Sequence, residues 1–266
     1  MKFRFLTLLA TLGWILRPAS AQTFIGDPAA VPTGLCGNAS LNGSYAVRLS
    51  GRQLGSTGTF TRVFQGVGKA TFDGQSQVTM TLNGNSLVAP FQTVYTGTYT
   101  IPANCSGTIT ITVGDSATYY VEVFDQGKNF SLTGSNDTYT FSGNGGVQPA
   151  SCQTSTLSGI WTFSAIGFST LSQAVTGMVE VSGLLQFDGQ GNLVANWNAA
   201  TITGIAAVNS TGTYSLAPDC TGTATLQDAN NNSYTLSIAV SNAAVTVIDL
   251  NAAGPQSLFS GSGNTE

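Results

Sequence analysis

Carboxylates are the residues of this chain best suited to acid-base chemistry. The sequence contains no histidine, which excludes a Ser-His-Asp triad, a histidine-assisted thiol and a histidine-ligated metal. Glu122 and Glu180 each stand among apolar neighbours, so either could act as a general acid or base if it faced a barrel interior. We favour a position on the water-facing side of each strand, because glutamate is seldom fully buried. The catalytic residues, if there are any, stay unknown.

One segment of the sequence partly matches a calcium-binding loop. The segment 228–232 has the acidic and amide residues that open a calcium-binding loop. However, Ser233 stands where such a loop needs glycine, and Ala239 stands where it needs a bidentate glutamate. We therefore expect a hairpin turn here and no metal site. No glycine-rich phosphate loop stands between a strand and a helix, so we expect no nucleotide or other cofactor.

Aromatic side chains offer a third chemistry, the stacking of sugar rings. On predicted strands such residues more often pack in a core or against a neighbouring strand, and we favour that interpretation. The residues concerned are Trp161, Trp197, Tyr45, Tyr95, Tyr99 and Tyr214.

Asparagine sequons would carry glycans if the protein is made in a eukaryote. Six are candidate acceptors: Asn38, Asn42, Asn129, Asn136, Asn209 and Asn231. A seventh, Asn104, is a doubtful acceptor because it is adjacent to Cys105.

An internal repeat organises the elements that would position these residues. The segment 97–110 recurs as 212–225 with half of its positions identical, and each copy contains Gly-Thr-Tyr followed by Cys-x-Gly-Thr. Other landmarks recur at almost the same spacing, including Asp73-Gly74 with Asp188-Gly189. Repetition at a fixed offset predicts two copies of one structural unit.

Four cysteines fall two to each copy. Cys36 and Cys105 enclose nearly the same span as Cys152 and Cys220. Four cysteines allow three pairings, and only pairing within each copy makes the two halves alike. We therefore predict two disulfides, the expected state in an exported protein. This assignment leaves no thiolate for a nucleophile or a zinc site.

The N-terminal segment predicts export. Residues 1–21 contain Lys2, Arg4, an apolar run and Ala19-Ser20-Ala21, which is the layout of a secretory signal peptide. Residues 22–35 then read as an irregular lead-in. We expect no membrane span, because no later apolar run approaches about 18 residues. The predicted location is secreted, either extracellular or at the cell surface.

The charge of the mature chain excludes several partners. Removing residues 1–21 leaves five basic residues against twelve acidic ones, a net charge of about −7. All five basic residues lie in the first copy. A second copy without lysine or arginine cannot neutralise phosphates, so nucleic acid and an anionic membrane surface are poor candidate partners.

Alternating apolar and polar residues predict strands throughout both copies. Ile109, Ile111 and Val113 alternate with threonines, as expected of a sheet with one buried face. We expect about eight strands per copy, with 59–64 and 67–72 separate, 176–182 and 184–188 separate, and 129–141 as one strand or two. Glycine-rich 142–153 is predicted to be a connector. The domains are then 36–146 and 147–266.

Closure into a barrel would remove the exposed edges of such a sheet. We therefore predict an all-β protein of two tandem antiparallel β-barrels of the lipocalin or calycin kind, each with one disulfide. Two β-sandwiches are the alternative architecture.

These motifs carry a family resemblance. Leu41-x-Gly43-x-Tyr45, Phe72-Asp73-Gly74 and Gly97-Thr98-Tyr99 followed by Cys105 resemble a secreted repeat domain of soil bacteria and fungi. The resemblance covers residues 36–146 and 150–262 and implies a lipocalin-like or allene-oxide-cyclase-like barrel. Its motifs are turns and strand starts, so it implies a fold and no catalytic residues.

Three functions remain consistent with the sequence. The first is a secreted, non-catalytic protein that binds a small apolar or neutral ligand. The second is a cofactor-free cyclase or isomerase that uses the shape of a barrel, with Glu122 or Glu180 as its acid or base. The third is a cell-wall protein that adheres to polysaccharide. Exposure of both glutamates outside any cavity would remove the candidates of the second function.

Overall fold

The computed structural model describes residues 35–54, 60–86, 89–171, 174–242, 246–254 and 257–265. The predicted signal peptide at 1–21 and nearly all of the predicted lead-in at 22–35 lie outside these residues. Both halves of the repeat belong to one compact unit, Pro32–Glu266.

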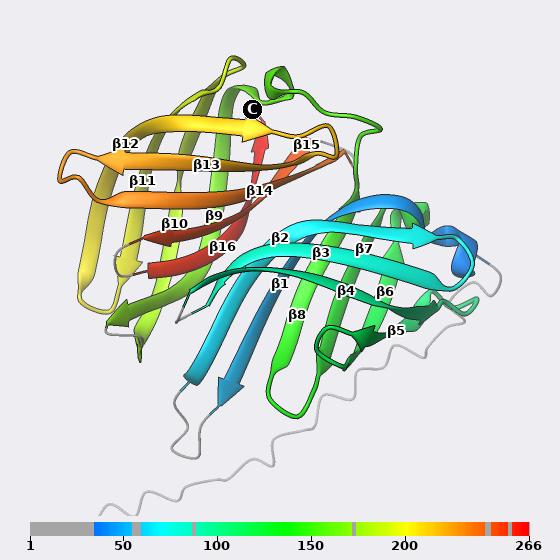
Figure 1. Ribbon diagram of the computed structural model, residues 1–266. Helices are drawn as coiled ribbons and strands as arrows, with labels where there is room; N and C mark the ends of the chain where they lie inside the picture. Colours follow the sequence, from blue (N-terminus) through cyan, green and yellow to red (C-terminus); the bar gives the residue numbers. More distant parts are fainter. Residues whose placement is uncertain are drawn as a thin grey trace, which may run out of the picture. The chain divides into compact units, whose positions relative to one another are not determined.

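The first half is a closed antiparallel barrel of eight strands, drawn from blue to green in Figure 1. Its strands are β1 (Asn42–Leu54), β2 (Phe60–Asp73), β3 (Gln77–Ser86), β4 (Pro90–Thr100), β5 (Ser106–Val113), β6 (Ala117–Phe124), β7 (Asn129–Ser135) and β8 (Thr140–Val147). Each strand pairs with the next, and β8 returns to β1 in a register that runs from Tyr45↔Val147 to Arg52↔Thr140.

The second half is a closed barrel of the same design, coloured from yellow-green to red. Its strands are β9 (Ser158–Leu171), β10 (Ala174–Asp188), β11 (Asn192–Thr201), β12 (Gly204–Leu216), β13 (Thr221–Asp228), β14 (Ser233–Asn242), β15 (Thr246–Gly254) and β16 (Ser257–Thr265). Pairing of β16 with β9 closes it. The prediction of two antiparallel eight-stranded barrels is confirmed, and the sandwich alternative is wrong.

Alternation along the strands separates interior from exterior, as the two-residue period requires. On β6, Ala117, Tyr119, Val121 and Val123 are buried and the residues between them are exposed. On β14 the pattern differs, because every residue from Leu236 to Ser241 is buried. The outer face of β14 packs against the first barrel, where Ala239 clusters with Ala46 and Val67, so this strand is covered on both sides.

Each barrel has one disulfide, and the predicted pairing is confirmed. Cys36 is bonded to Cys105 and Cys152 to Cys220. The second cysteine of each pair has a positive φ, 67° at Cys105 and 63° at Cys220. The shared backbone conformation supports one ancestral unit for the two barrels.

Three short 3-10 helices complete the described chain: η1 (Asn38–Ser40), η2 (Asp125–Gly127) and η3 (Thr154–Thr156). η1 and η3 stand at equivalent places, just before the first strand of each barrel. The hydroxyl of a buried tyrosine donates to a backbone carbonyl of each helix, from Tyr99 to Asn38 in η1 and from Tyr214 to Thr154 in η3.

The strand boundaries differ from the prediction in the same way in both barrels. Residues 59–64 and 67–72 belong to one strand, β2, and residues 176–182 and 184–188 belong to β10. Gly66 and Gly183 stand at the predicted breaks and lie inside these strands. A Cβ at Gly183 would lie 2.2 Å from the carbonyl oxygen of Asn196, so glycine there permits close strand pairing rather than a turn.

The predicted connector begins too early. Residues 142–147 form most of β8 and pair with β1, so this glycine-rich segment is a strand. Gly145 is needed there because a Cβ would lie 2.4 Å from the ring of Phe130. The barrel interior leaves no space for a side chain at that point.

The two Asp-Gly turns have the positive φ expected of glycine, 76° at Gly74 and 75° at Gly189. The loops are three residues long rather than two, because β3 begins at Gln77 and β11 at Asn192. The Asp73 carboxylate accepts backbone N–H bonds that organise its loop, from Gln77, Gln75 and Ser76. These bonds, that of Gln77 first, lower the pKa of Asp73.

Candidate ligand-binding cleft

Neither predicted acid-base residue lies inside a barrel. Glu122 is exposed on the outside of β6, where its carboxylate accepts a hydrogen bond from the Ser106 hydroxyl. Glu180 is exposed on the outside of β10, between the buried core residues Val179 and Val181. The two carboxylates belong to different barrels and form no common site. Of the two, Glu180 lines a cleft between the barrels.

Aromatic side chains fill the interior of the first barrel. The ring of Phe72 packs edge-on against Tyr45 at 5.4 Å and against Tyr99 at 5.0 Å. Farther along the interior, Phe64 packs against Phe91 and Phe141. The core therefore occupies the space that a lipocalin-type ligand would use.

Aromatic side chains of the described residues pack inside the second barrel in the same manner. Phe187 and Tyr214 pack at 4.9 Å, and Trp197 and Tyr234 pack at 5.2 Å. Trp161 is 1% exposed. All six aromatic residues proposed for sugar stacking, Tyr95 included, are buried, so they do not form a surface platform.

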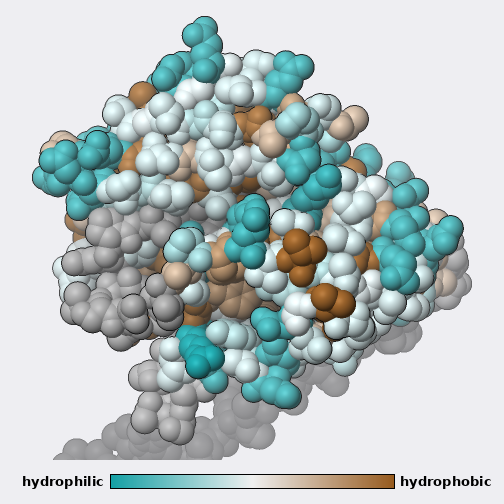
Figure 2. Space-filling view, viewed as in Figure 1, coloured by the Kyte–Doolittle hydropathy of each residue, from teal (hydrophilic) through white to brown (hydrophobic). Residues whose placement is uncertain are grey.

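A cleft of about 780 Å³ lies where the barrels meet. Figure 2 shows brown, hydrophobic side chains in a hollow between the barrels. Strands β1, β2 and β8 form one wall, and β9, β10, β11, β12 and β16 form the other. The outer faces of both barrels thus create a cavity within the size range of small-molecule sites.

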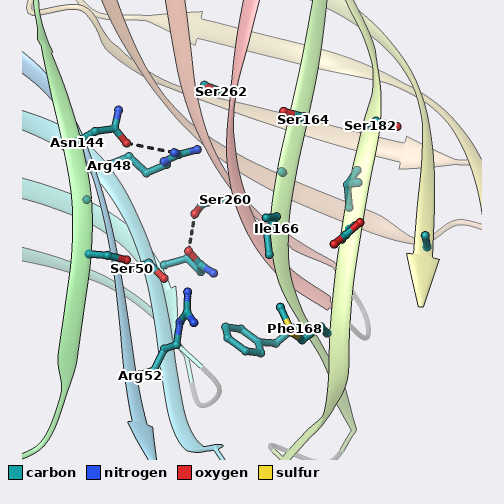
Figure 3. A pocket seen from close by; sticks show the side chains of 18 of the residues that line it. Arg48, Ser50, Arg52, Asn144, Ser164, Ile166, Phe168, Ser182, Ser260 and Ser262 are labelled. Carbon is teal, nitrogen blue, oxygen red and sulfur yellow. Dashed lines mark hydrogen bonds between the residues drawn. The ribbon is translucent and has the colours of Figure 1, made fainter. Parts of the chain in front are cut away.

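The first-barrel wall is cationic and polar. Arg48, Ser50 and Arg52 point outward from β1, and Ser142 and Asn144 stand beside them on β8 (Figure 3). The guanidinium of Arg48 donates to Asn144 Oδ1 at 3.1 Å. Because the acceptor is a neutral amide, the charge of Arg48 is not neutralised by this contact.

The second-barrel wall is arranged in rows across its strands. One row is hydroxylic, with Ser262, Ser164 and Ser182 paired across β16, β9 and β10. The next row is mainly apolar and crosses β9 to β12: Ile166, Glu180, Ala200 and Ile205. A third row contains Phe168 beside Met178. The wall therefore changes from hydroxyl groups to apolar side chains over two rows.

Direct contacts between the barrels form the base of the cleft. The Ser260 hydroxyl donates to Gln65 Oε1, and both residues are buried (Figure 3). Val63 packs with Phe168 and Leu258 in a buried cluster that joins the barrels. Ala46, Val67 and Ala239 form a second such cluster.

One further contact crosses the cleft. The guanidinium carbon of Arg52 lies 5.9 Å from the centre of the Phe168 ring, within the range of a cation–π interaction. Figure 3 shows the two side chains pointing toward one another from opposite walls.

The segment that resembles a calcium loop is a hairpin turn. Asp228 accepts hydrogen bonds from the side chain and backbone of Asn232 and from the backbone of Asn230. The bond from the Asn232 side chain is the first cause that lowers the pKa of Asp228. Within the described part of the chain, no group of three or more Cys, Asp or Glu side chains could hold a metal ion.

One sequon asparagine has a structural role. Asn38 Oδ1 accepts from the backbone of Ile101 at 2.7 Å, and its amide donates to Gln75. A glycan on this nitrogen would compete with the contact to Gln75. Asn42, Asn209 and Asn231 are exposed, and Asn129 and Asn136 are partly buried.

No helix in the described ranges is long and apolar enough to cross a bilayer.

No protein family and no curated protein matches the chain in sequence. A de novo designed fluorescence-activating β-barrel is 10% identical, with a TM-score of 0.32 over 43% of this chain and 99% of that one. A protein of unknown function of the DUF3598 family from Nostoc punctiforme is 12% identical, with a TM-score of 0.27 over 85% of this chain and 97% of that one. The fold described above rests on the strand pairing and not on these similarities.

The sequence did contain a signal for the cleft. Arg48 and Arg52 are four residues apart, so on a strand they share a face. The residues opposite them could not be identified from the sequence, because the packing of one barrel on the other is not a local property.

Proposed function

We propose that this protein is a secreted, non-catalytic binding protein whose small ligand lies in the cleft between the two barrels. The observation that supports this site is the contrast between barrel interiors in which described aromatic side chains pack together and a cleft of about 780 Å³ with apolar and polar walls. The sequence predicts a small apolar or neutral ligand. The ligand that we propose is still small, but its binding site lies in the cleft between the barrels and not inside a barrel.

Export is supported by two features. Each barrel has a disulfide, which is typical of oxidising compartments. The first 21 residues have the layout of a signal peptide. We also propose that the chain belongs to the secreted repeat family of soil bacteria and fungi that its motifs resemble.

A probe that is apolar and uncharged tests the site. N-phenyl-1-naphthylamine fluoresces more strongly when it leaves water, so titration gives its affinity for the full chain. Ser182 is exposed on the cleft wall, and a tryptophan there would occupy part of the cavity. Ser182→Trp should weaken probe binding about tenfold, the cost of losing roughly 1.4 kcal/mol of contact.

Thr225→Trp is the matched control. Thr225 is exposed on β13, outside the residues that line the cleft. It should leave the affinity within about twofold. Equal affinities of the two variants would place the probe elsewhere and contradict the proposal, as would no binding by the unmodified protein.

A cofactor-free isomerase is a second candidate, because Glu180 lines the cleft. Here Glu180 would be the acid or base, and Glu122 would have no role. Glu180→Gln separates the two functions. If the protein only binds its ligand, Glu180→Gln keeps the affinity and neither protein turns the ligand over. If the protein is an isomerase, Glu180→Gln still binds the substrate but no longer converts it.

A further inference from the structure

We infer that the cleft binds an amphipathic monocarboxylate, with its carboxylate at Arg48 and Arg52 and its apolar tail along the opposite wall. This inference rests on the proposed function and specifies the class of ligand.

The two walls of the cleft include equivalent strands of the repeat, β1 and β9, whose outward residues differ in charge. Cys36 corresponds to Cys152, and the same offset matches Arg48 with Ser164 and Arg52 with Phe168. All four of these latter residues line the cleft. One copy therefore presents guanidinium groups at the positions where the other presents a hydroxyl and an aromatic ring.

The arginines are placed to share one headgroup. They are alternate outward residues of β1 separated by Ser50, so their Cα atoms are roughly 13 Å apart along the strand. Their side chains can converge above Ser50 and its cross-strand partner Ser142. Hydroxyl groups at this point add hydrogen-bond donors for a carboxylate oxygen.

The contacts made by these arginines leave their charge available. Arg48 donates to an amide oxygen, and Arg52 lies over an aromatic ring. Guanidinium groups bind carboxylates through paired, charge-assisted hydrogen bonds. A cationic pair next to neutral partners therefore favours an anionic headgroup over a neutral one.

The apolar tail has a defined path. Arg52 meets Phe168 at the border between the cationic and apolar walls. From there Met178 on β10 and Ile166 on β9 continue the apolar surface, and Ile205 on β12 lies beyond Glu180 and Ala200 in the row of Ile166. The side chains of Met178, Ile166 and Ile205 are exposed. A chain covering these side chains would remove apolar surface from water on both partners.

Glu180 limits the ligand to a single negative charge. Its carboxylate stands in the apolar row between Ile166 and Ala200. A second anionic group at the tail end would lie beside this carboxylate and be repelled. Among the described residues, two arginines and one glutamate are the charged side chains that line the cleft, so a bound monoanion neutralises it.

Displacement of the neutral probe tests the headgroup separately from the site. Decanoate and 1-decanol have the same chain length and differ in charge at neutral pH. Decanoate should displace N-phenyl-1-naphthylamine from the unmodified protein at about a tenfold lower concentration than 1-decanol, as expected of one charge-assisted contact. In the double variant Arg48→Gln/Arg52→Gln, decanoate and 1-decanol should displace the probe at equal concentrations, each compared with that variant's own affinity for the probe.

Arg62→Gln is the matched control. Arg62 is exposed on the neighbouring strand β2 and is outside the cleft lining, so its loss changes the net charge without changing the site. Circular dichroism melting confirms that each variant folds. Equal displacement by decanoate and decanol, or an equal effect of Arg62→Gln and the double variant, overturns the carboxylate assignment while leaving probe binding in the cleft intact. Absence of probe binding overturns the proposed function and this inference together.

Discussion

Removal of one hydroxyl from each barrel should destabilise the two barrels equally. Tyr99 Oη donates to the carbonyl oxygen of Leu41 at 2.9 Å, and Tyr214 Oη donates to that of Leu157 at 2.7 Å. Both acceptor residues are 0% exposed. Each tyrosine thereby fixes the short helix that leads into the first strand of its barrel. Replacement by phenylalanine keeps the ring and removes only the hydroxyl contacts, which also reach the carbonyl oxygens of Asn38 and Thr154.

The cost follows from the burial of the acceptor. A buried carbonyl that loses its donor costs about 1–3 kcal/mol in the free energy of unfolding. With a urea m-value of about 2 kcal/mol/M, the midpoint of unfolding should fall by about 0.5–1.5 M. Tyr99→Phe and Tyr214→Phe should give similar shifts, because the two sites have the same geometry.

The buried hydroxyl of Tyr99 should also make the folding stability depend on pH in the alkaline range. Burial raises the pKa of Tyr99 from 10.0 to about 12. A raised pKa means that its contribution to stability is complete below pH 10 and is lost as the pH rises toward 12. Tyr99→Phe should remove this part of the alkaline destabilisation.

Urea unfolding at pH 7 with intact disulfides measures these effects. Tyr120→Phe is the control, because Tyr120 is 67% exposed and the loss of its hydroxyl should change stability by less than about 0.5 kcal/mol. A shift for Tyr99→Phe no larger than that of Tyr120→Phe would refute the assigned role of the hydroxyl. A large shift for only one of the buried tyrosines would contradict the equivalence of the barrels.

Three other changes test the fold. Backbone donors, that of Gln77 first, lower the pKa of Asp73 below 3.8, so the contribution of this carboxylate to folding stability is present above that pH and is lost on further acidification. Asp73→Asn should therefore flatten the acid limb of a curve of stability against pH. An unchanged acid limb would contradict this role of Asp73. The double variant Cys36→Ser/Cys105→Ser opens a loop of 69 residues and should lose up to about 4 kcal/mol in urea unfolding, whereas a loss below about 1 kcal/mol would show that the bond adds little. In Gly212→Ala the new Cβ would lie 1.8 Å from a carbonyl oxygen of β13, so we expect a melting temperature lowered by several degrees, and unchanged melting would contradict the close strand approach.

The sequence predicts the repeat, the disulfides and the barrels because each produces a recognisable pattern of residue types and spacings. Equal cysteine spacing and two-residue alternation are visible without knowing the packing. The predicted breaks at 65–66 and at 183 are wrong because glycine has two roles that look alike in sequence. Gly183 lies within β10, where it admits a neighbouring strand, and Gly189 forms a turn.

The cleft depended on information that the sequence does not display locally. Alternation predicts that Arg48 and Arg52 face outward, but it does not say which surface lies opposite. That depends on how Ala46, Val67 and Ala239 pack between the barrels. Glu180 illustrates the same limit, since the sequence predicts its exposure but not its position in a cleft.

A crystal structure of the full chain with decanoate tests the central claim most directly. We predict density for the ligand between the barrels, with its carboxylate within hydrogen-bond distance of Arg48 or Arg52 and its chain against Ile166 and Met178. Density for decanoate inside either barrel, or a cleft without ligand at a concentration that displaces the neutral probe, would contradict the assignment of the binding site.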